Sequence, residues 1–318
     1  MPHTFDLLVL GDANPDVVVG PLDRPLAFGQ HEHLVPTGLL TLGGSGAITA
    51  CGAARLGLSV AIAGRIGDDD AGRFVRAALA DRGVDTSALR VDPSLPTPLT
   101  TVLTRTDGDR AIVTAAGTLA ATGPDDVPEE LLRRSRHVHA SSYFLMPRLA
   151  RALPELLRIA RAAGAATSLD TNDDPAGRWD PAALAAVLPA VDYLLPNAQE
   201  ARALAGSPAA TTEQAAARLA GHGPVVVVKD GGAGAFAHDG ANVLRTPGIP
   251  AEPVDTVGAG DSFDAGLIAA LLAGEPLARA LDFAAACGAL STRATGGTAA
   301  QPTRDEALDA LARNGKNQ

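Results

Sequence analysis

The chain has 318 residues, of which 46% are hydrophobic and 19% charged, with a formal net charge of -10. This length and hydrophobic content exclude a disordered or fibrous protein and are sufficient for one continuous domain over residues 1–318. The excess of acidic residues argues against nucleic acid or an anionic membrane as partner, because both select clustered Lys and Arg.

The N-terminal segment MPHTFDLLVLGD contains no basic leader, and no apolar run approaches the length of a membrane span. The two cysteines, Cys51 and Cys287, lie in helical patterns rich in small residues and predict no disulfide framework. We therefore expect a cytoplasmic protein.

Strand-like apolar runs alternate with helical segments along the chain. FDLLVLG predicts a first strand, a helix is expected from Ser45 to Leu56 before Gly57, and VAIAGRIG predicts the next strand. The alternation returns through HVHASS, ATSLDTN, DYLLPN and PVVVVKDGG. The pattern predicts an α/β fold with a doubly wound, mainly parallel sheet flanked by helices.

Two segments interrupt this alternation, at about 15–40 and 97–115. The second has β-branched residues on both sides of a turn at Thr106 to Asp109, which is typical of a β-hairpin. We expect the two segments to pair into a small β-sheet that projects over one edge of the main sheet as a lid.

The stretch DTVGAGDSFDAG, residues 255 to 266, predicts a helix that begins with almost no side chains. The first amides of a helix have no partner inside it and favour an anion, and Gly258, Ala259 and Gly260 would let a phosphate approach closely. Asp261 beside such a site suits a general base that deprotonates an attacking hydroxyl, as phosphoryl transfer to an alcohol requires. The alternative is an ordinary helix cap in which Asp261 only favours the dipole.

Further motifs accompany this stretch in a fixed order. They are LGGSGAITACGAARLG at 42–57, GRIGDDDAGRFVRAALADRGVD directly after the second strand, PNAQE at 196–200 and VKDGGAGA at 228–235. With DTVGAGDSFDAG, this set resembles the ribokinase-like (PfkB-type) family of carbohydrate kinases nearly end to end. The resemblance implies a ribokinase-like fold that uses ATP and Mg²⁺, with Asp261 as the catalytic base.

The resemblance also implies a nucleotide side of the site. Asn197 and Glu200 would help to hold Mg²⁺ and the phosphates through water, while Lys229, Gly231 and Gly234 match the nucleotide segment. The alternatives are helix capping by Asn197 with a solvated Glu200, and a plain surface turn at the glycines.

A further expectation concerns a monovalent cation. Asp255 and the backbone of Val257 match the place where relatives bind an activating ion such as K⁺, and the loop from Ala294 to Gly297 would supply the remaining ligands.

For the acceptor sugar, the resemblance points to residues at predicted strand ends. Asp16 would bind sugar hydroxyls beside Asn14, and Gly43 and Gly44 would let the sugar lie against the backbone. The remaining pocket residues that we predict are Ser45, Tyr143 and Asn172. Ser45 and Ile48 replace the Lys and Asn of many sugar-kinase relatives, and Ile48 would make the pocket drier.

Four histidines and one arginine also stand out. His31 with His33, and His137 with His139, each lie on one face of a predicted strand, but neither pair has a third ligand at metal-site spacing. Structural or substrate-facing roles are therefore favoured over a metal site. Arg110 beside the hairpin turn could reach the site from the lid.

These inferences together predict an ATP-dependent phosphotransferase that moves the γ-phosphate to a hydroxyl of a small sugar, as ribokinases and fructokinases do. Two alternatives stay open: a nucleoside kinase of the same family, and a catalytically idle sugar- or nucleotide-sensing protein on this fold. An NAD-dependent oxidoreductase would need a glycine finger after the first strand, and GDANPD supplies none. We also expect a homodimer that forms through the strands of the lid.

Overall fold

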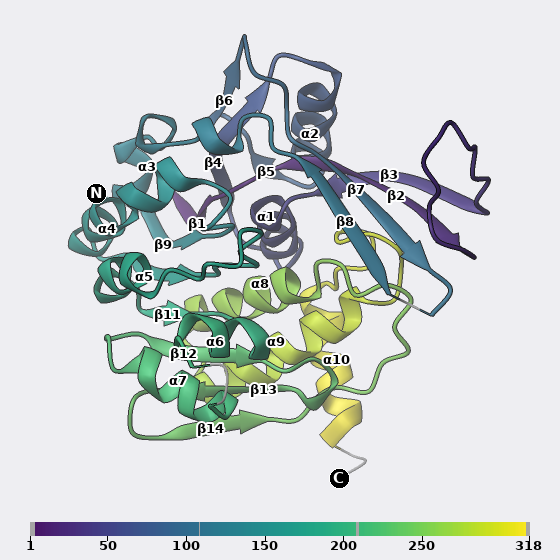
Figure 1. Ribbon diagram of the computed structural model, residues 1–318. Coiled ribbons are helices and arrows are strands. Elements are labelled where there is room, and N and C mark those ends of the chain that lie inside the picture. Colours follow the sequence, from purple (N-terminus) through teal and green to yellow (C-terminus); the bar gives the residue numbers. More distant parts are fainter. Residues whose placement is uncertain (1–3, 108, 208–209, 316–318) are drawn as a thin grey trace.

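The computed structural model describes residues 4–315 except 108 and 208–209. Its central sheet has the strand order β14-β13-β12-β11-β10-β9-β1-β4-β5, with β6 paired to β4 (Figure 1). The strands are β1 (Phe5–Leu10), β4 (Val60–Gly67), β5 (Val84–Asp85), β6 (Leu89–Asp92), β9 (Ser135–Ala140), β10 (Ala166–Leu169), β11 (Tyr193–Leu194), β12 (Val225–Lys229), β13 (Ala235–His238) and β14 (Val243–Thr246).

In the spatial order of the sheet, the neighbouring strands β5, β4, β1, β9, β10, β11 and β12 run parallel, which confirms the mainly parallel sheet. The edge formed by β12, β13 and β14 is antiparallel and was not predicted. Only residues 230–234 separate β12 from β13, whereas a parallel crossover needs about a dozen residues. This short connection forces the chain to turn back beside β12.

Helices cover both faces of the central sheet. On one face lie α1 (Ser45–Arg55), α2 (Asp70–Ala80), α8 (Ala259–Leu272), α9 (Leu277–Ser291) and α10 (Arg304–Gly315). On the other lie α3 (Glu129–Arg133), α4 (Pro147–Ala162), α5 (Pro181–Val187), α6 (Ala198–Leu204) and α7 (Thr212–Ala220). Short 3-10 turns are η1 (Leu119–Ala121), η2 (Pro124–Asp126), η3 (Leu188–Ala190) and η4 (Gly231–Ala233).

Strand β1 shows why the apolar runs are continuous. Leu7 and Val9 enter the cluster beneath α1 and α8, while Leu8 and Leu10 enter the cluster beneath α4. Because successive side chains point to opposite faces, a strand covered on both sides needs apolar residues at every position. The predicted doubly wound architecture is thereby confirmed.

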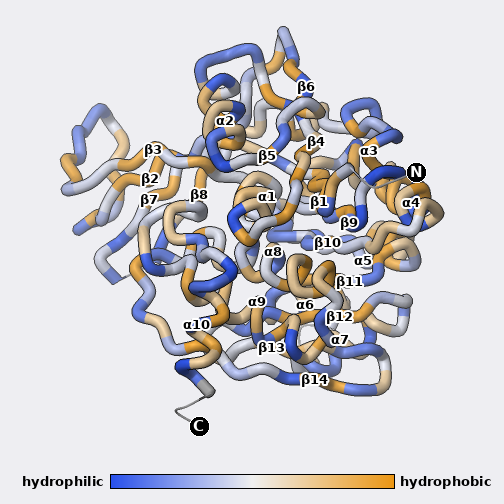
Figure 2. Tube along the Cα trace, turned by 180° about the vertical axis from the view of Figure 1, so that it is seen from behind, coloured by the Kyte–Doolittle hydropathy of each residue, from blue (hydrophilic) through white to orange (hydrophobic). Residues whose placement is uncertain are grey.

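A separate sheet with the order β3-β2-β7-β8 forms the lid. Its strands are β2 (Asn14–Leu22), β3 (Thr37–Gly43), β7 (Leu99–Arg105) and β8 (Arg110–Ala115), so the two interrupting segments pair as expected. Figure 2 shows hydrophobic stretches along these projecting strands. His31 and His33 correct one prediction, because they lie in the irregular, exposed segment 23–36 and not on a strand.

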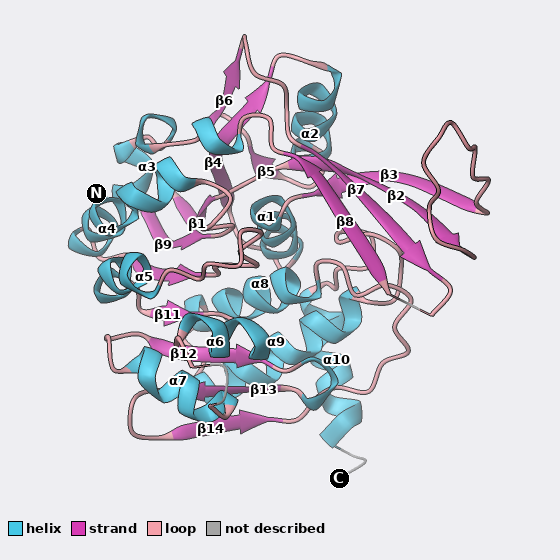
Figure 3. Cartoon of the chain, in the orientation of Figure 1, coloured by secondary structure: helices cyan, strands magenta, loops and turns pink. Residues whose placement is uncertain are grey.

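The parallel strands β1, β9, β10, β11 and β12 all end at one edge of the sheet, which we call the carboxyl edge (Figure 3). The chain leaves β1 toward β4 on one side and later returns to β9 on the other. Such a switch in winding direction opens a crevice in which doubly wound proteins bind ligands. The fold therefore predicts a site above β1 and β9.

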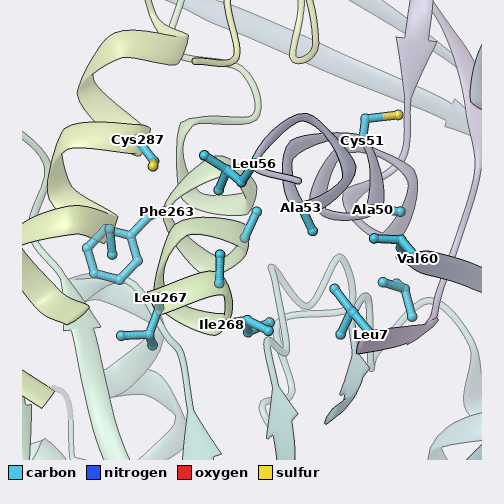
Figure 4. Close-up of a cluster of buried hydrophobic side chains, with 14 of the residues drawn as sticks. Leu7, Ala50, Cys51, Ala53, Leu56, Val60, Phe263, Leu267, Ile268 and Cys287 are labelled. Atoms are coloured by element: carbon cyan, nitrogen blue, oxygen red, sulfur yellow. The ribbon is translucent and has the colours of Figure 1, made fainter. Parts of the chain in front are cut away.

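Helix α8 crosses the molecule beside α1 and begins near this edge. Figure 4 shows its side chains Phe263, Leu267 and Ile268 in the same apolar cluster as Leu7 of β1 and Cys287 of α9. Nearly every position of α8 from Asp261 to Ala270 is buried, as expected for a helix that is apolar all round. Burial on all sides fixes the position of the helix start.

Candidate active site

The start of α8 is as bare as the sequence predicts. Gly258 caps the helix in the left-handed region with φ 72°, and no side chain caps the helix amides. Gly258, Ala259 and Gly260 are half-buried, and in the described part of the chain no acceptor faces the amides of Gly258 and Gly260. Free N–H groups at the positive end of a helix dipole form an anion site.

Ile48 is buried and packs against this corner, and its predicted effect on the sugar pocket stays a prediction. A Cβ atom at Gly258 would lie 3.0 Å from Ile48 Cγ2 and 2.7 Å from the Cα of Gly297. The left-handed conformation and this close contact together require glycine at 258.

Asp261 lies in the first turn of α8 and is 8% exposed. Its carboxylate accepts a hydrogen bond from the Ser45 hydroxyl, and Asn172 Nδ2 donates to the same hydroxyl over 2.9 Å. Burial, and then the negative charge of Asp170, raise the pKa of Asp261 to about 7. A carboxylate that titrates near neutral pH suits general-base chemistry better than helix capping.

A hydrogen-bond chain connects this acid to two further strand ends. The amide of Ser142, after β9, donates to Asn172 Oδ1 over 2.7 Å, and the Ser142 hydroxyl donates to Asp12, after β1, over 2.8 Å. Asp12 also accepts the amide of Gly46 in α1 over 3.0 Å. Asn172 and Ser142 both have positive φ, 54° and 52°, a strained conformation that is often found at functional sites. Asp12 and Ser142 were not predicted from the sequence, although both follow strands.

On the lid side, Asp16 lies in a row of polar residues that crosses the lid sheet. Strand register places Asp16 between Thr41 of β3 and Thr100 of β7, with Thr114 of β8 next to Thr100. Asn14 Nδ2 donates to Asp16 over 2.8 Å and to Thr100 over 3.2 Å. Burial and the charge of Asp12 raise the pKa of Asp16 to about 7. The row offers hydroxyl and carboxylate groups of the kind that bind sugar hydroxyls.

Gly43 and Gly44 pack against these groups. A Cβ at Gly43 would lie 2.0 Å from Asp16 Oδ1, and one at Gly44 would lie 2.9 Å from Asn14 Oδ1. Gly44 also has φ 88° at the start of α1. Both glycines therefore make room for protein side chains in the structure, whatever they contribute to a sugar.

On the nucleotide side, Asn197 and Glu200 form a capping box. Asn197 Oδ1 accepts the amides of Gln199 and Glu200, both over 2.9 Å, and Glu200 Oε2 accepts the amide of Asn197 over 2.8 Å. The structure therefore agrees with helix capping, which was the alternative interpretation of Asn197. Glu200 is not solvated, however: it is 8% exposed, and burial followed by the charge of Asp170 raises its pKa to about 7.

Lys229 and Gly234 make contacts within the protein, and the nucleotide-binding roles predicted for them stay predictions. The Lys229 ammonium is buried in ion pairs with Asp170, at 2.6 Å, and Asp264, at 3.1 Å. A Cβ at Gly234 would lie 2.2 Å from the carbonyl oxygen of Thr246, so this glycine is required by close chain packing. Gly231 has φ 54° and open space beside it, which leaves its backbone accessible.

The predicted cation-binding segment lies next to the start of α8. Asp255 accepts the amide of Val257 over 3.0 Å and the amide of Gly296 over 2.9 Å, so the loop that contains Gly296 lies against it as expected. Arg110 of the lid donates to Thr256 over 3.0 Å and lies 3.7 Å from Asp255. The lid arginine thus reaches this corner of the site.

Tyr143, His137 and His139 occupy the interior. The Tyr143 ring packs edge-on against Phe144 in the apolar cluster beneath α4, so the structure does not bring it to the carboxylates. Both histidine rings hydrogen-bond to the Ser168 hydroxyl, over 2.7 and 2.8 Å, and burial lowers their pKa values to about 3 and 4. They are neutral core groups, in line with the structural role that we favoured.

A helix start suited to an anion, a buried acid and a polar lid are together the parts that a phosphoryl-transfer site requires. A family model described as pfkB family carbohydrate kinase matches residues 5–304. The chain belongs to this family. The resemblance drawn from the sequence motifs is confirmed.

Similar proteins agree with this family. An ATP-dependent ribose-1-phosphate kinase of Halopiger xanaduensis is 34% identical over 83% of this chain and 84% of its own length. A fructokinase of Klebsiella pneumoniae is 33% identical over 83% of this chain and 90% of its own length. The structure of Arabidopsis thaliana ribokinase complexed with ribose and ATP has a TM-score of 0.83 at 27% identity and covers 98% of this chain and 99% of that one. The chain is an ATP-dependent sugar kinase of the pfkB family, as the sequence motifs predicted.

The environment of Asp261 predicts a pH dependence for this pfkB-family kinase. Because its pKa is raised to about 7 and a base must be ionised to accept a proton, kcat/KM for the sugar should increase as pH rises through about 7. Steady-state rates of ADP release between pH 5 and 9 measure this acid limb. A limb below pH 5 would contradict the raised pKa.

Proposed function

We propose that this kinase transfers the γ-phosphate of ATP to a hydroxyl of a small neutral sugar, with Asp261 as general base. The observation that supports this proposal most strongly is the pairing of Asp261 with free helix amides at the same corner. Asp261 would take the proton of the sugar hydroxyl, whose oxygen then bonds to the γ-phosphorus as the bond to ADP breaks. The free amides of Gly258 and Gly260 would stabilise the charge on the transferred group, beside the Ala259 amide, which donates to the Thr256 carbonyl oxygen over 3.3 Å.

The Ser45 hydroxyl supports this assignment. It donates to Asp261, which is the contact that a substrate hydroxyl must make. Asn172 supports Ser45 from the opposite side. We infer that the acceptor hydroxyl binds beside Ser45 and takes its place on Asp261.

The residues at the start of α6 fit a role toward Mg²⁺. Glu200 presents a buried carboxylate oxygen beside the negatively charged Asp170, and hard cations select such oxygen ligands, often through water. Glu200 and Asn197 would hold the ion in this way. The ion, when bound with ATP, would neutralise phosphate charge.

An activating K⁺ at Asp255 and Val257 stays a proposal. Asp255 keeps a partly exposed carboxylate there, and Arg110 already brings positive charge to within 3.7 Å of it. A comparison of rates in KCl with rates in a tetraalkylammonium salt tests the requirement.

The charges around the pocket favour a neutral acceptor over a phosphorylated sugar. Asp12, Asp16, Asp255 and Asp261 are all acidic, and the nearby lid cation Arg110 is already engaged with Asp255. A phosphate group on the substrate would be repelled by these carboxylates. We therefore infer a different acceptor from that named for the Halopiger relative.

A nucleoside acceptor is favoured by one further observation. Next to the polar row of Asp16, the same face of the lid carries Leu39, Val18, Val102 and Ile112 in one cross-strand row. Ile112 is 60% exposed, so an apolar group of the substrate would find cover there. Release of ADP across a panel of pentoses, hexoses and nucleosides decides between the two acceptors. A catalytically idle sensor would release none.

Replacement of Asp261 by asparagine removes the base and keeps the size of the side chain. Turnover should fall by about two to four decades, the usual scale for loss of a general base, while ATP binding measured by calorimetry stays unchanged. Asp70→Asn, at the exposed start of α2, is the matched control and should keep full activity. Wild-type turnover in Asp261→Asn would remove this residue from the mechanism.

Gly43 offers a test of the sugar side that leaves Asp16 in place. The Cβ of Gly43→Ala would overlap the Asp16 carboxylate and displace it, so KM for the sugar should rise about tenfold or more with KM for ATP unchanged. In Gly38→Ala, on the same strand, the new Cβ meets only Val19 at an ordinary 3.7 Å. Equal sugar KM values in the two variants would contradict the role of Asp16.

We also propose a homodimer through the lid and a cytoplasmic location. On the face opposite Ile112, the lid exposes Leu40 and Val113 by 55% and 61%, which is unusual for a free surface. Cys51 and Cys287 are free and buried, which suits a reducing compartment. Within the described residues, no helix is both long and apolar enough to cross a bilayer.

Charge on the lid should dissociate this dimer. Val113→Asp should sediment as a monomer at micromolar concentration while the wild type sediments as a dimer. Leu244→Asp on β14 is the control, because Leu244 is 41% exposed at the far edge of the central sheet. A monomeric wild type, or dissociation by both variants, would refute the lid interface.

A further inference from the structure

Lys229 at the end of β12 has surroundings that the nucleotide-binding role does not explain. Its ammonium lies 2.6 Å from Asp170 Oδ2, at the end of β10, and 3.1 Å from both carboxylate oxygens of Asp264, in α8. The Lys229 side chain is 11% exposed, and those of Asp170 and Asp264 are 3% and 0% exposed. A buried ion pair of this kind costs desolvation energy, and its retention calls for a role beyond stability.

The ion pairs lie directly beside the proposed catalytic base. One carboxylate oxygen each from Asp170, Asp261 and Asp264 lie within 4.8 Å of one another. The ammonium also lies 3.4 Å from the position that a Cβ would take at Gly260, so it adjoins the helix start. Three acids in this space repel one another strongly at low dielectric.

The charged groups that face Asp261 come from four elements. Asp12 follows β1, Asp170 follows β10, Lys229 ends β12 and Asp264 lies one turn along α8. Among these, within the described chain, Lys229 is the cation. The ammonium therefore brings its positive charge to two of the three clustered carboxylates, Asp170 and Asp264, and adjoins the helix start that carries the third.

The protonation states of the cluster follow from these contacts. Burial is the largest influence on Asp170 and would raise its pKa, but the charge of Lys229 together with hydrogen bonds to Asp264, Lys229 and the amide of Asn172 holds that pKa below its usual value. Burial raises the pKa of Asp264 well above its usual value. Asp170 is thus a fixed negative charge next to Asp261, and Lys229 is the charge that compensates it.

We propose that Lys229 is a positioning residue, which compensates the charge of Asp170 so that Asp261 can ionise at neutral pH and accept the proton of the sugar. The inference rests on the proposed role of Asp261 as base. The proton moves only from the sugar hydroxyl to Asp261, and Lys229 keeps its own protons throughout.

Opposite charge changes on the two sides of the ion pair provide the test. In Lys229→Met, Asp170 loses its compensation, so the acid limb of kcat/KM for the sugar should move to higher pH by about one unit. In Asp170→Asn, the ammonium stays while the negative charge is lost, so the limb should move to lower pH. The double variant loses both charges, and its limb should return toward the wild-type position.

The direction of these shifts separates charge compensation from a structural role. Thermal unfolding of each variant controls for loss of fold, and the double variant compared with Asp170→Asn gives the same information if Lys229→Met does not fold. A limb that stays in place while only the melting temperature falls would overturn the inference. So would an unmoved limb with a raised KM for ATP, because Lys229 would then act on the nucleotide.

Asp261→Asn keeps the two proposals distinguishable. If Asp261→Asn retains turnover, the proposed function fails and the limb belongs to another group. If Asp261→Asn is inactive while the limbs of Lys229→Met and Asp170→Asn coincide with that of the wild type, Asp261 remains the base and only the role of Lys229 is refuted.

Discussion

The site depends on one electrostatic constraint, which is that a helix start rich in free N–H groups must lie beside an acid. Helix α8 is buried along almost its whole length, so its first turn cannot shift without disturbing the apolar cluster that it shares with α1, α9 and β1. Asp261 lies on that first turn and is held by Ser45 from α1. The core of the protein thereby fixes the distance between the proposed anion site and Asp261, the proposed base.

Hydrogen bonds and charge interactions connect the lid to the central sheet at the carboxyl edge. Asp12, after β1, bonds to α1 and to Ser142 after β9, and its charge acts on both Asp16 of the lid and Asp261 of α8. Arg110 crosses from the lid to Asp255 on the other side. A sugar between these groups would be enclosed by both sheets, which excludes the water that would otherwise accept the phosphoryl group.

The sequence predicted elements that depend on local chemistry. The strand VAIAGRIG, the hairpin turn after residue 105 and the bare start of α8 all follow from residue patterns that act over a few positions. The antiparallel edge at β13 and β14 was missed because its strands are short and their direction is set by the length of the connection. Residues 31–33 were misassigned because alternation of histidines resembles a strand without the pairing partners that a strand requires.

Site residues could be predicted where they lie within a sequence motif. They could not be predicted where residues distant in the sequence meet only in the folded protein. Asp261 and Asp16 lie in motifs, whereas Asp170 and Lys229 are 59 positions apart and meet because β10 and β12 end at the same edge. A lysine at a strand end is compatible with a phosphate ligand or with an ion pair, and sequence alone does not choose. Burial favours the ion pair. Because Asp170 and Asp264 are enclosed at the same edge, the ammonium of Lys229 lowers the electrostatic energy of the protein itself before any nucleotide binds.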